Sequence, residues 1–236
     1  MSRAAVVWAE GDRLRVAEIS ETAVSLIGRL DVATAPLRDP TVSREHARIR
    51  AHGGGFVLEH LGRNPTMINN VPVAHPTGLS DGAVIQVGNV RLVFYDLAAA
   101  DRVSAPVVCS HCARENQRGD TECWFCGASL VNAPSLSIRC RPVTCRVISA
   151  AGHALDLFSD EALLFQPNGD AEVRPRPRIS ADAPAFIEMQ ERRPFLRLAQ
   201  PGAPIWLNGR SAVDGDHLGT GDELRVGQAH YVLVVR

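Results

Sequence analysis

The feature that most constrains the fold of this chain is a series of short apolar runs separated by turn residues. Over residues 1–98 the runs are three to five residues long, and clusters such as Gly53-Gly54-Gly55 and Asn69-Asn70 divide them. Runs this short fit strands rather than helices, and turns at this spacing are typical of sandwiches. The pattern therefore predicts an all-β sandwich for this part of the chain.

Composition and charge limit the partners. The 236 residues leave room for more than one core, since 45% are hydrophobic and 22% are charged. The formal net charge of -1 gives no global field that would attract nucleic acid or an anionic membrane. No run approaches the ~18 apolar residues of a membrane span, and early charged residues leave no room for a signal peptide. We expect a cytoplasmic protein with no membrane segment.

An internal repeat extends the predicted architecture to the last hundred residues. Residues 26–29 and 40–43 match residues 163–166 and 177–180 at an offset of 137. At an offset of 139 the matches are Phe56 with Phe195, Asn69-Asn70 with Asn208-Gly209, Leu79 with Leu218, Gly82 with Gly221, and 85–88 with 224–227. We therefore predict a second, diverged sandwich over residues 136–236. Chance matching of turns between two β-rich segments is the alternative.

Four of the six cysteines form two C-x-x-C pairs, Cys109 with Cys112 and Cys123 with Cys126. Together they offer four soft ligands to a tetrahedral Zn²⁺, and four protein ligands leave no open position for catalysis. The run resembles a short zinc ribbon, which we place at residues 105–131 and expect to depend on structural zinc for folding. Cys140 and Cys145 lie on strand-like sequence and are interpreted as small apolar residues.

The first hundred residues also carry an ordered set of loop motifs. In chain order these are Gly28-Arg29, Ser43-Arg44-Glu45-His46, Arg63-Asn64-Pro65-Thr66 and Asn69-Asn70. In order and spacing they resemble the forkhead-associated (FHA) domain, a β-sandwich that binds phosphothreonine peptides. The resemblance implies an all-β chain with two FHA-like sandwiches, at residues 1–98 and 136–236, joined by the small four-cysteine zinc ribbon.

The resemblance also implies which residues bind the phosphopeptide. A phosphothreonine dianion needs several charge-assisted hydrogen bonds to offset its desolvation, each worth ~1.5–3 kcal/mol. The implied ligands are Arg29, Ser43, Arg44, Arg63 and Asn64. Among them, Ser43 would offer both its hydroxyl and its amide, and Asn64 would hold the peptide backbone. Gly28 would let the backbone come close, and His46 would support the binding loop without touching phosphate.

The sequence departs from the family pattern in two places. Gly62 stands where the family usually has serine, which removes a loop hydroxyl, and Arg63 is expected to compensate as an extra cation. In the C-terminal copy, Gln166, Ala181 and Ala183 take the places of Arg29, Arg44 and His46. Neutral residues cannot offset the cost of desolvating a dianion, so we expect a copy that does not bind phosphate and serves as a docking surface. The arginine–proline run 174–178 is expected to be a solvated loop.

These features favour a non-catalytic phosphothreonine-binding adaptor in Ser/Thr kinase signalling. Its partner would be a phosphothreonine-containing protein, either a kinase or a kinase substrate. The alternative is a zinc-ribbon nucleic-acid-binding or transcription-associated protein, which the three carboxylates against two arginines between the cysteine pairs disfavour. Residues 52–55 superficially resemble an esterase oxyanion loop, but no G-x-S-x-G motif accompanies them, so we do not expect an enzyme.

Overall fold

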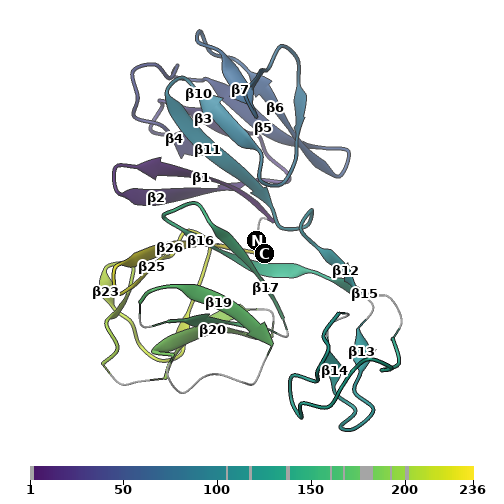
Figure 1. Ribbon diagram of the computed structural model, residues 1–236. Helices are drawn as coiled ribbons and strands as arrows, with labels where there is room; N and C mark the ends of the chain where they lie inside the picture. Colours follow the sequence, from purple (N-terminus) through teal and green to yellow (C-terminus); the bar gives the residue numbers. More distant parts are fainter. Residues whose placement is uncertain are drawn as a thin grey trace.

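The computed structural model of the chain is all-β, as the apolar runs predicted. Figure 1 shows two β-sandwiches, one above the other, with a small module to one side. Among the described residues no helix is long and apolar enough to cross a membrane. The described residues are 3–104, 106–116, 119–136, 139–159, 161–166, 168–175, 183–191, 193–199 and 202–236.

The first sandwich consists of a six-stranded and a five-stranded sheet. The six-stranded sheet has the order β2 (Arg13–Ile19), β1 (Ala4–Glu10), β11 (Val90–Asp96), β10 (Val84–Val87), β7 (Thr66–Ile68) and β8 (Val71–Pro72). The five-stranded sheet has the order β4 (Ala35–Pro36), β3 (Ser25–Gly28), β5 (Ala47–His52), β6 (Gly55–His60) and β9 (Thr77–Leu79). Val6, Ile49 and Phe94 are among the residues buried between them. Side chains alternate between the two faces of a strand, so each short run can supply one core face.

The second sandwich has the same strand order as the first. Its six-stranded sheet runs β17 (Ala154–Phe158), β16 (Val143–Ser149), β26 (Ala229–Val235), β25 (Glu223–Val226), β22 (Ile205–Leu207) and β23 (Arg210–Ser211). Its five-stranded sheet runs β19 (Ala171–Pro175), β18 (Glu161–Phe165), β20 (Ala185–Gln190), β21 (Arg193–Leu198) and β24 (Asp216–His217). Cys145 is fully buried in this apolar core, as interpreted from the sequence, whereas the side chain of Cys140 is not among those described.

The correspondence between the two sandwiches extends from strand order to individual turns. Asn69 and Asn208 both have left-handed backbones, with φ of 49° and 51°. Each accepts a hydrogen bond on Oδ1 from a backbone N–H at 2.9 Å, donated by Val84 and Glu223 respectively. Asparagine tolerates this conformation and bonds locally to the backbone, which explains why the turn residue is the same in both.

One sequence match is displaced by a residue. Ile49 pairs with Leu58 in the first sandwich, and Ile187 pairs with Leu196 in the second. Because all four are fully buried, the offset here is 187 − 49 = 196 − 58 = 138, not 139. Phe195 therefore does not correspond to Phe56, whose place is taken by the buried Pro194. A one-residue shift reverses the face of a strand, which is why the half-buried Phe195 points away from the core.

The cysteine module is inserted between two short paired strands, which together form a stalk. Strand β12 (Arg102–Ser104) pairs antiparallel with β15 (Arg139–Arg141). The chain between them contains the pair β13 (Val107–Val108) and β14 (Glu115–Asn116). In Figure 1 this module lies beyond the stalk, beside the second sandwich rather than between the two.

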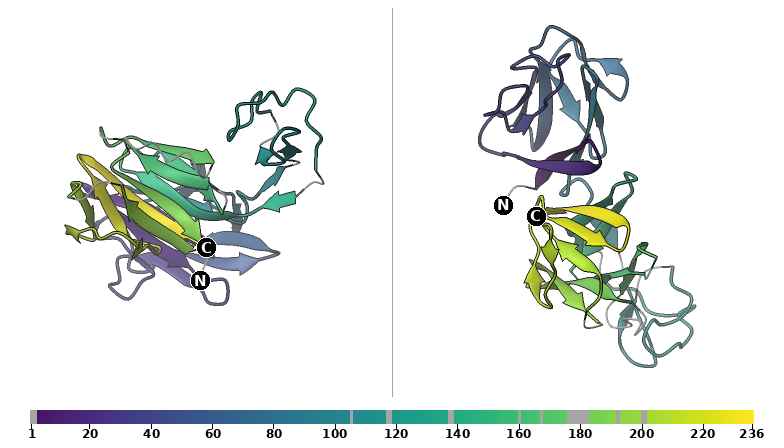
Figure 2. Two further views of the ribbon diagram at one scale, coloured as in Figure 1. Left: turned by 90° about the horizontal axis from the view of Figure 1, so that it is seen from below. Right: turned by 90° about the vertical axis from the view of Figure 1, so that its left-hand side faces the viewer.

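The two six-stranded sheets pack against each other through their outer faces. Ala5, Val7 and Tyr95 from the first meet Phe158 and Val232 from the second in one buried cluster. Figures 1 and 2 show the β1–β2 hairpin beside the sheet that contains β16 and β26. Because β1 and β16 are covered on both faces, their buried residues are consecutive rather than alternating.

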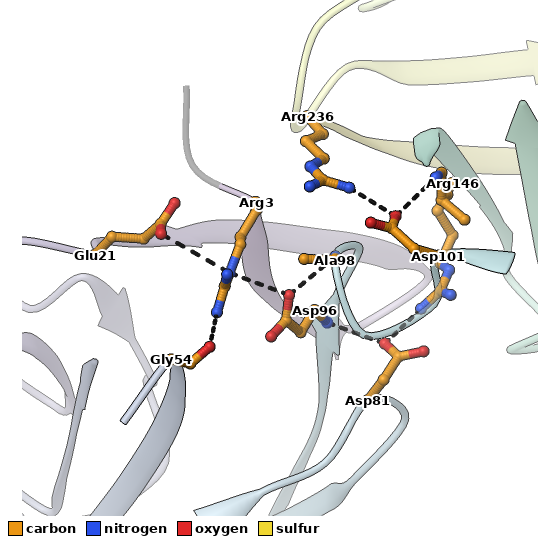
Figure 3. A network of polar contacts seen from close by, with 10 residues as sticks. Arg3, Glu21, Gly54, Asp81, Asp96, Ala98, Asp101, Arg146 and Arg236 are labelled. Atoms are coloured by element: carbon orange, nitrogen blue, oxygen red, sulfur yellow. Dashed lines mark hydrogen bonds and ion pairs between the residues drawn. The ribbon is translucent and has the colours of Figure 1, made fainter. Parts of the chain in front are cut away.

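A buried arginine crosses the contact between the sandwiches, as Figure 3 shows. Arg146 donates from Nη1 to Asp81 at 2.7 Å and from Nε to Asp156 at 2.6 Å, and its guanidinium lies 5.0 Å from the Tyr95 ring centre. Burial lowers the pKa of Arg146, but the two carboxylates outweigh burial and hold it above the ordinary range. Nearby, Arg236 donates to Asp101 at 2.6 Å.

Candidate functional site

Three loops of the first sandwich bring together the five residues predicted to bind phosphopeptide. The loops join β3 to β4, β4 to β5, and β6 to β7. The N–H of Arg29 donates to the Ser43 carbonyl at 2.9 Å, and the N–H of Arg63 donates to Ser43 Oγ at 3.0 Å. Asn64 Nδ2 donates to the Thr41 carbonyl at 2.8 Å. These contacts place cations from three separate loops at one end of the sandwich.

Gly28 is needed where the first two loops meet. A Cβ at this position would lie 2.1 Å from the carbonyl oxygen of Arg44, closer than any real contact. With glycine here, the Leu30 N–H donates to that carbonyl at 3.2 Å, and Arg29 Nε donates to the Val42 carbonyl at 3.3 Å. The backbone approach expected of Gly28 is therefore present, and it sets the positions of Arg29 and Arg44 together.

Ser43 offers less than the sequence suggested. Its backbone N–H donates to Nδ1 of His46 at 3.0 Å, so this amide is already occupied. Its hydroxyl accepts the Arg63 N–H and retains its own proton for a ligand. The hydroxyl, and not the amide, is thus the group of Ser43 that an anion would meet.

His46 supports the loops from below, as expected. Its side chain is fully buried, with its ring 5.7 Å from that of His60 in an edge-on arrangement. Since Nδ1 accepts a hydrogen bond from Ser43, the proton of the neutral ring lies on Nε2. Nε2 faces the carbonyls of Asn64 and Pro65 without reaching full hydrogen-bond geometry with either. Burial lowers the pKa of His46, against the effect of these carbonyls, and so favours the neutral ring.

Gly62 departs from the family pattern for a reason visible in the structure. A Cβ at residue 62 would lie 2.7 Å from Cδ2 of His46. Both the Leu61 and the Gly62 N–H groups donate to the His46 carbonyl at 2.9 Å, which keeps this loop tight against the histidine. Glycine therefore removes a hydroxyl but permits close packing on the ring.

Asp39 and Thr41 form a second support that sequence reasoning missed. The Thr41 N–H donates to Asp39 Oδ1 at 2.8 Å, and the Thr41 hydroxyl donates to the same oxygen. These bonds lower the pKa of Asp39. The Asn89 N–H donates to the Thr41 hydroxyl at 2.9 Å, and a Cβ on Gly88 would lie 2.3 Å from that oxygen. An Asp-x-Thr spacing is typical of an Asx turn and was the available signal.

The electrostatics of the three loops favour an anion. Arg29, Arg44 and Arg63 are all exposed, and none forms an ion pair with another described residue. Arginines without a carboxylate partner present their planar donor groups to solvent, where a phosphate can accept them bidentately. Among the described residues, the three loops therefore carry positive charges that no carboxylate neutralises.

Comparisons with known proteins match the part of the chain that contains the three loops. The FHA domain family matches residues 25–88, which contain all three loops. This segment is an FHA domain. The glycogen accumulation regulator GarA of Mycolicibacterium smegmatis is 44% identical over 59 residues, which are 25% of this chain and 37% of GarA. The match thus spans little more than a third of that relative.

Solved FHA structures each resemble part of the chain. One, from a study of phosphothreonine-dependent FHA domain interactions, is 32% identical and covers 39% of this chain and 94% of its own, with a TM-score of 0.36. Another, the FhaA FHA domain complexed with the intracellular domain of Rv3910, is 33% identical and covers 39% and 98%, with a TM-score of 0.35.

The four predicted zinc ligands converge in the small module. The sulfur atoms of Cys109, Cys112, Cys123 and Cys126 lie within 4.8 Å of one another. The Cys109–Cys126 and Cys112–Cys123 sulfur distances are 3.7 and 3.6 Å. Four sulfurs at ~2.3 Å from a tetrahedral zinc would be about 3.8 Å apart. The sulfur positions therefore fit a Zn²⁺ ion.

Two matched turns present these sulfurs. The Ala113 N–H donates to the Cys109 carbonyl and the Gly127 N–H to the Cys123 carbonyl, both at 2.9 Å, and both donors have positive φ, 58° and 73°. Burial raises the pKa of the Cys123 thiol, but the N–H groups of Cys126 and Phe125 and the neighbouring thiols outweigh burial and bring it to about 6. Thiolate is the form that binds zinc.

The matching end of the second sandwich is built differently. Strands β3 and β4 are parallel and joined by a loop, whereas β18 and β19 form an antiparallel hairpin. Ile27 pairs with Ala47 and Phe165 with Ala185, so Gln166 takes the place of Gly28, not of Arg29 as the sequence match suggested. Ala183 is fully buried. Ala181 and most of the 174–178 run lie outside the described residues.

Proposed function

We propose that the FHA domain binds a phosphothreonine segment of a partner protein, and that the chain is a non-catalytic adaptor in Ser/Thr kinase signalling. The observation that carries this proposal is that Arg29, Arg44 and Arg63 are exposed on three adjoining loops and form no ion pair with another described residue, while the Arg63 N–H bonds to the Ser43 hydroxyl. The partner is a kinase or a kinase substrate, and the chain acts in the cytoplasm.

Each loop residue has a role in this proposal. Arg29 and Arg44 neutralise the dianion, and the Ser43 hydroxyl donates to a phosphate oxygen. Arg63 adds charge from the third loop. Asn64 is held by the Thr41 carbonyl, so its remaining amide atoms are positioned for the peptide backbone.

The test compares a phosphothreonine peptide library with its unphosphorylated and phosphoserine counterparts, using fluorescence anisotropy on the full chain. Wild type should bind only phosphothreonine peptides strongly. Arg29→Ala should weaken binding by about 2–5 kcal/mol, because a desolvated charge loses its partner.

Arg91→Ala is the matched control, since it removes an exposed arginine of β11 that belongs to none of the three loops. It should leave the affinity unchanged. Equal affinity for phosphorylated and plain peptides, or equal losses in the two variants, would contradict the proposal.

We also propose that Cys109, Cys112, Cys123 and Cys126 hold one structural Zn²⁺ in a ribbon at residues 105–131. The metal would fix both turns and leave no coordination position open. Elemental analysis of protein purified under reducing conditions should give one zinc per chain. Chelation should disorder the module while phosphopeptide affinity is retained. Protein that contains no stoichiometric metal and has the same amide spectrum with and without chelator would refute this.

The second sandwich, within residues 136–236, is proposed to be a degenerate FHA-like domain that does not bind phosphate, beside a phosphopeptide-binding domain at residues 1–98. A hairpin in place of the β3–β4 loop supports this, because residues 166–170, which join β18 to β19, include no arginine. In phosphopeptide titrations, amide shifts should be confined to the first sandwich. Saturable changes in the amide chemical shift of Gln166 in the Arg29→Ala variant would show that the second sandwich also binds phosphopeptide.

A further inference from the structure

A groove opens between the two sheets of the first sandwich, at the side where β2 and β4 form their edges. Its volume is about 360 Å³, and its lining includes Trp8, Arg15, Val16, Thr34, Pro36 and Arg38. Trp8 is nearly buried and forms an apolar floor with Pro36. The groove lies on the flanks of the phosphate loops, and none of the five proposed phosphopeptide ligands lines it.

The side chain of Val16 in β2 packs against the cluster between the sandwiches, but its backbone has no partner among the described residues. The two-residue turn Gly11-Asp12 joins β1 to β2, so Glu10 and Arg13 form the closing hydrogen-bonded pair. Bonded pairs then alternate along an antiparallel ladder, which leaves the N–H and C=O of Val16 directed away from β1. Strand β2 ends its sheet, and no described segment bonds to this backbone.

The facing edge cannot accept a strand in the same way. Strand β4 is two residues long and contains Pro36, which has no N–H to donate. The sandwich thus has one open edge and one blocked edge on either side of the groove. A strand added here would pair with β2, and every second side chain would point into the groove.

The charges of the groove are unbalanced. Arg15 pairs with Glu10 at 2.9 Å and lies 4.0 Å from Glu223 of the second sandwich. Arg38 is exposed and forms no ion pair within the described parts of the chain. The groove therefore combines an apolar floor with one unneutralised cation.

We propose that β2 and this groove bind an extended, unphosphorylated segment of a partner protein as an added strand. An apolar side chain of the segment covers Trp8, and an acidic side chain two residues away pairs with Arg38. Strand addition supplies backbone hydrogen bonds common to any sequence, and the groove selects alternate side chains. This site is separate from the proposed phosphothreonine site and does not depend on it.

The experiment selects phage-displayed, unphosphorylated seven-residue peptides, the length of β2, on the full chain. Enriched peptides should carry aspartate or glutamate two residues from an apolar residue. Arg38→Glu should weaken the affinity for the tightest-binding synthetic peptide roughly tenfold or more, because the acidic residue of the peptide then faces another carboxylate. Reversing the peptide's acidic residue to arginine should restore binding to Arg38→Glu. Arg91→Glu is the control and should bind as wild type does.

Backbone pairing has its own test. N-methylation of the peptide amides that face β2 should abolish binding, whereas N-methylation of the alternate amides, which face away, should not. The bound peptide should also slow hydrogen exchange of the Val16 amide. Arg29→Ala should bind these peptides normally, which separates this site from the phosphate loops. No enrichment over bare support, or equal affinity of wild type and Arg38→Glu, would overturn the proposal.

Discussion

The two sandwiches share a strand order and several turn residues, yet within the described residues only the first has three adjoining loops with exposed arginines that form no ion pair. Asn69 and Asn208 accept equivalent hydrogen bonds in the same backbone conformation, in turns that are not part of the phosphate loops. The loop between β3 and β4, in contrast, has become a hairpin between β18 and β19. The β framework and the proposed phosphopeptide site therefore depend on different residues, so either can change without the other.

The largest effect is expected where the sandwiches meet. Arg146→Met leaves Asp81 and Asp156 without their shared partner in a mostly buried contact, which should cost about 3 kcal/mol or more. Urea unfolding of the full chain should show this as an earlier transition. Adding Asp81→Asn and Asp156→Asn should recover most of the loss. If the triple variant is no more stable than Arg146→Met, the carboxylates are not the cause.

A second effect should separate framework from site within the first sandwich. Gly28→Ala places a Cβ against the Arg44 carbonyl and should cost about 1–3 kcal/mol, with a loss of phosphopeptide affinity as Arg44 moves. Gly78→Ala is the matched control, because its Cβ would meet nothing within 4 Å. Denaturant midpoints and peptide titrations of both variants provide the measurement. Equal behaviour of the two would contradict the close approach.

The matched turns allow a direct test of the repeat. Asn69→Gly and Asn208→Gly each keep a backbone that tolerates positive φ but remove the hydrogen bond that the side-chain oxygen accepts. Each should cost about 1 kcal/mol for this bond, and Asn208→Gly should cost slightly more because Asn208 also donates an exposed hydrogen bond to Asp222. Hydrogen exchange of core amides in the full chain would report each sandwich separately. A loss of amide protection in only one sandwich would contradict the proposed equivalence of the turns.

The smallest effect concerns pH. Burial lowers the pKa of His46, so the folded state favours the neutral ring, and this stability is present above the ordinary histidine pKa of ~6.5 and lost as pH falls below it. Below about pH 6.5 the protection factors of core amides in the first sandwich, corrected for the intrinsic exchange rate, should fall more steeply in wild type than in the His46→Gln variant. An identical pH dependence in wild type and variant would exclude His46 as the group responsible.

Local features were the predictable part of this structure. Short apolar runs and turn residues define strands and hairpins, because they act on near neighbours, and the cysteine spacing brought four sulfurs together. The engagement of the Ser43 amide by His46 could not be foreseen, because spacing does not say which groups of a loop bond internally. The displaced match of Phe195 arose because the offset between the copies changes by one residue along the chain.

The contact between the sandwiches was also missed, although a signal existed. Alternation predicts one buried face, whereas the run from Ala4 to Trp8 is apolar at every position. Such a run indicates a strand covered on both sides. Arg146 gave no such signal, because a charged residue in a strand normally faces solvent and its partners Asp81 and Asp156 are distant in sequence or on another strand.

The chain that connects the two sandwiches passes through the whole cysteine module, which lies between the paired strands β12 and β15. The sandwiches themselves are in direct contact through the apolar cluster and Arg146. A protease that cuts the chain inside the module would therefore yield two fragments that stay associated. Each fragment carries one complete sandwich, so co-expressed halves should reassemble into a nicked but otherwise intact molecule.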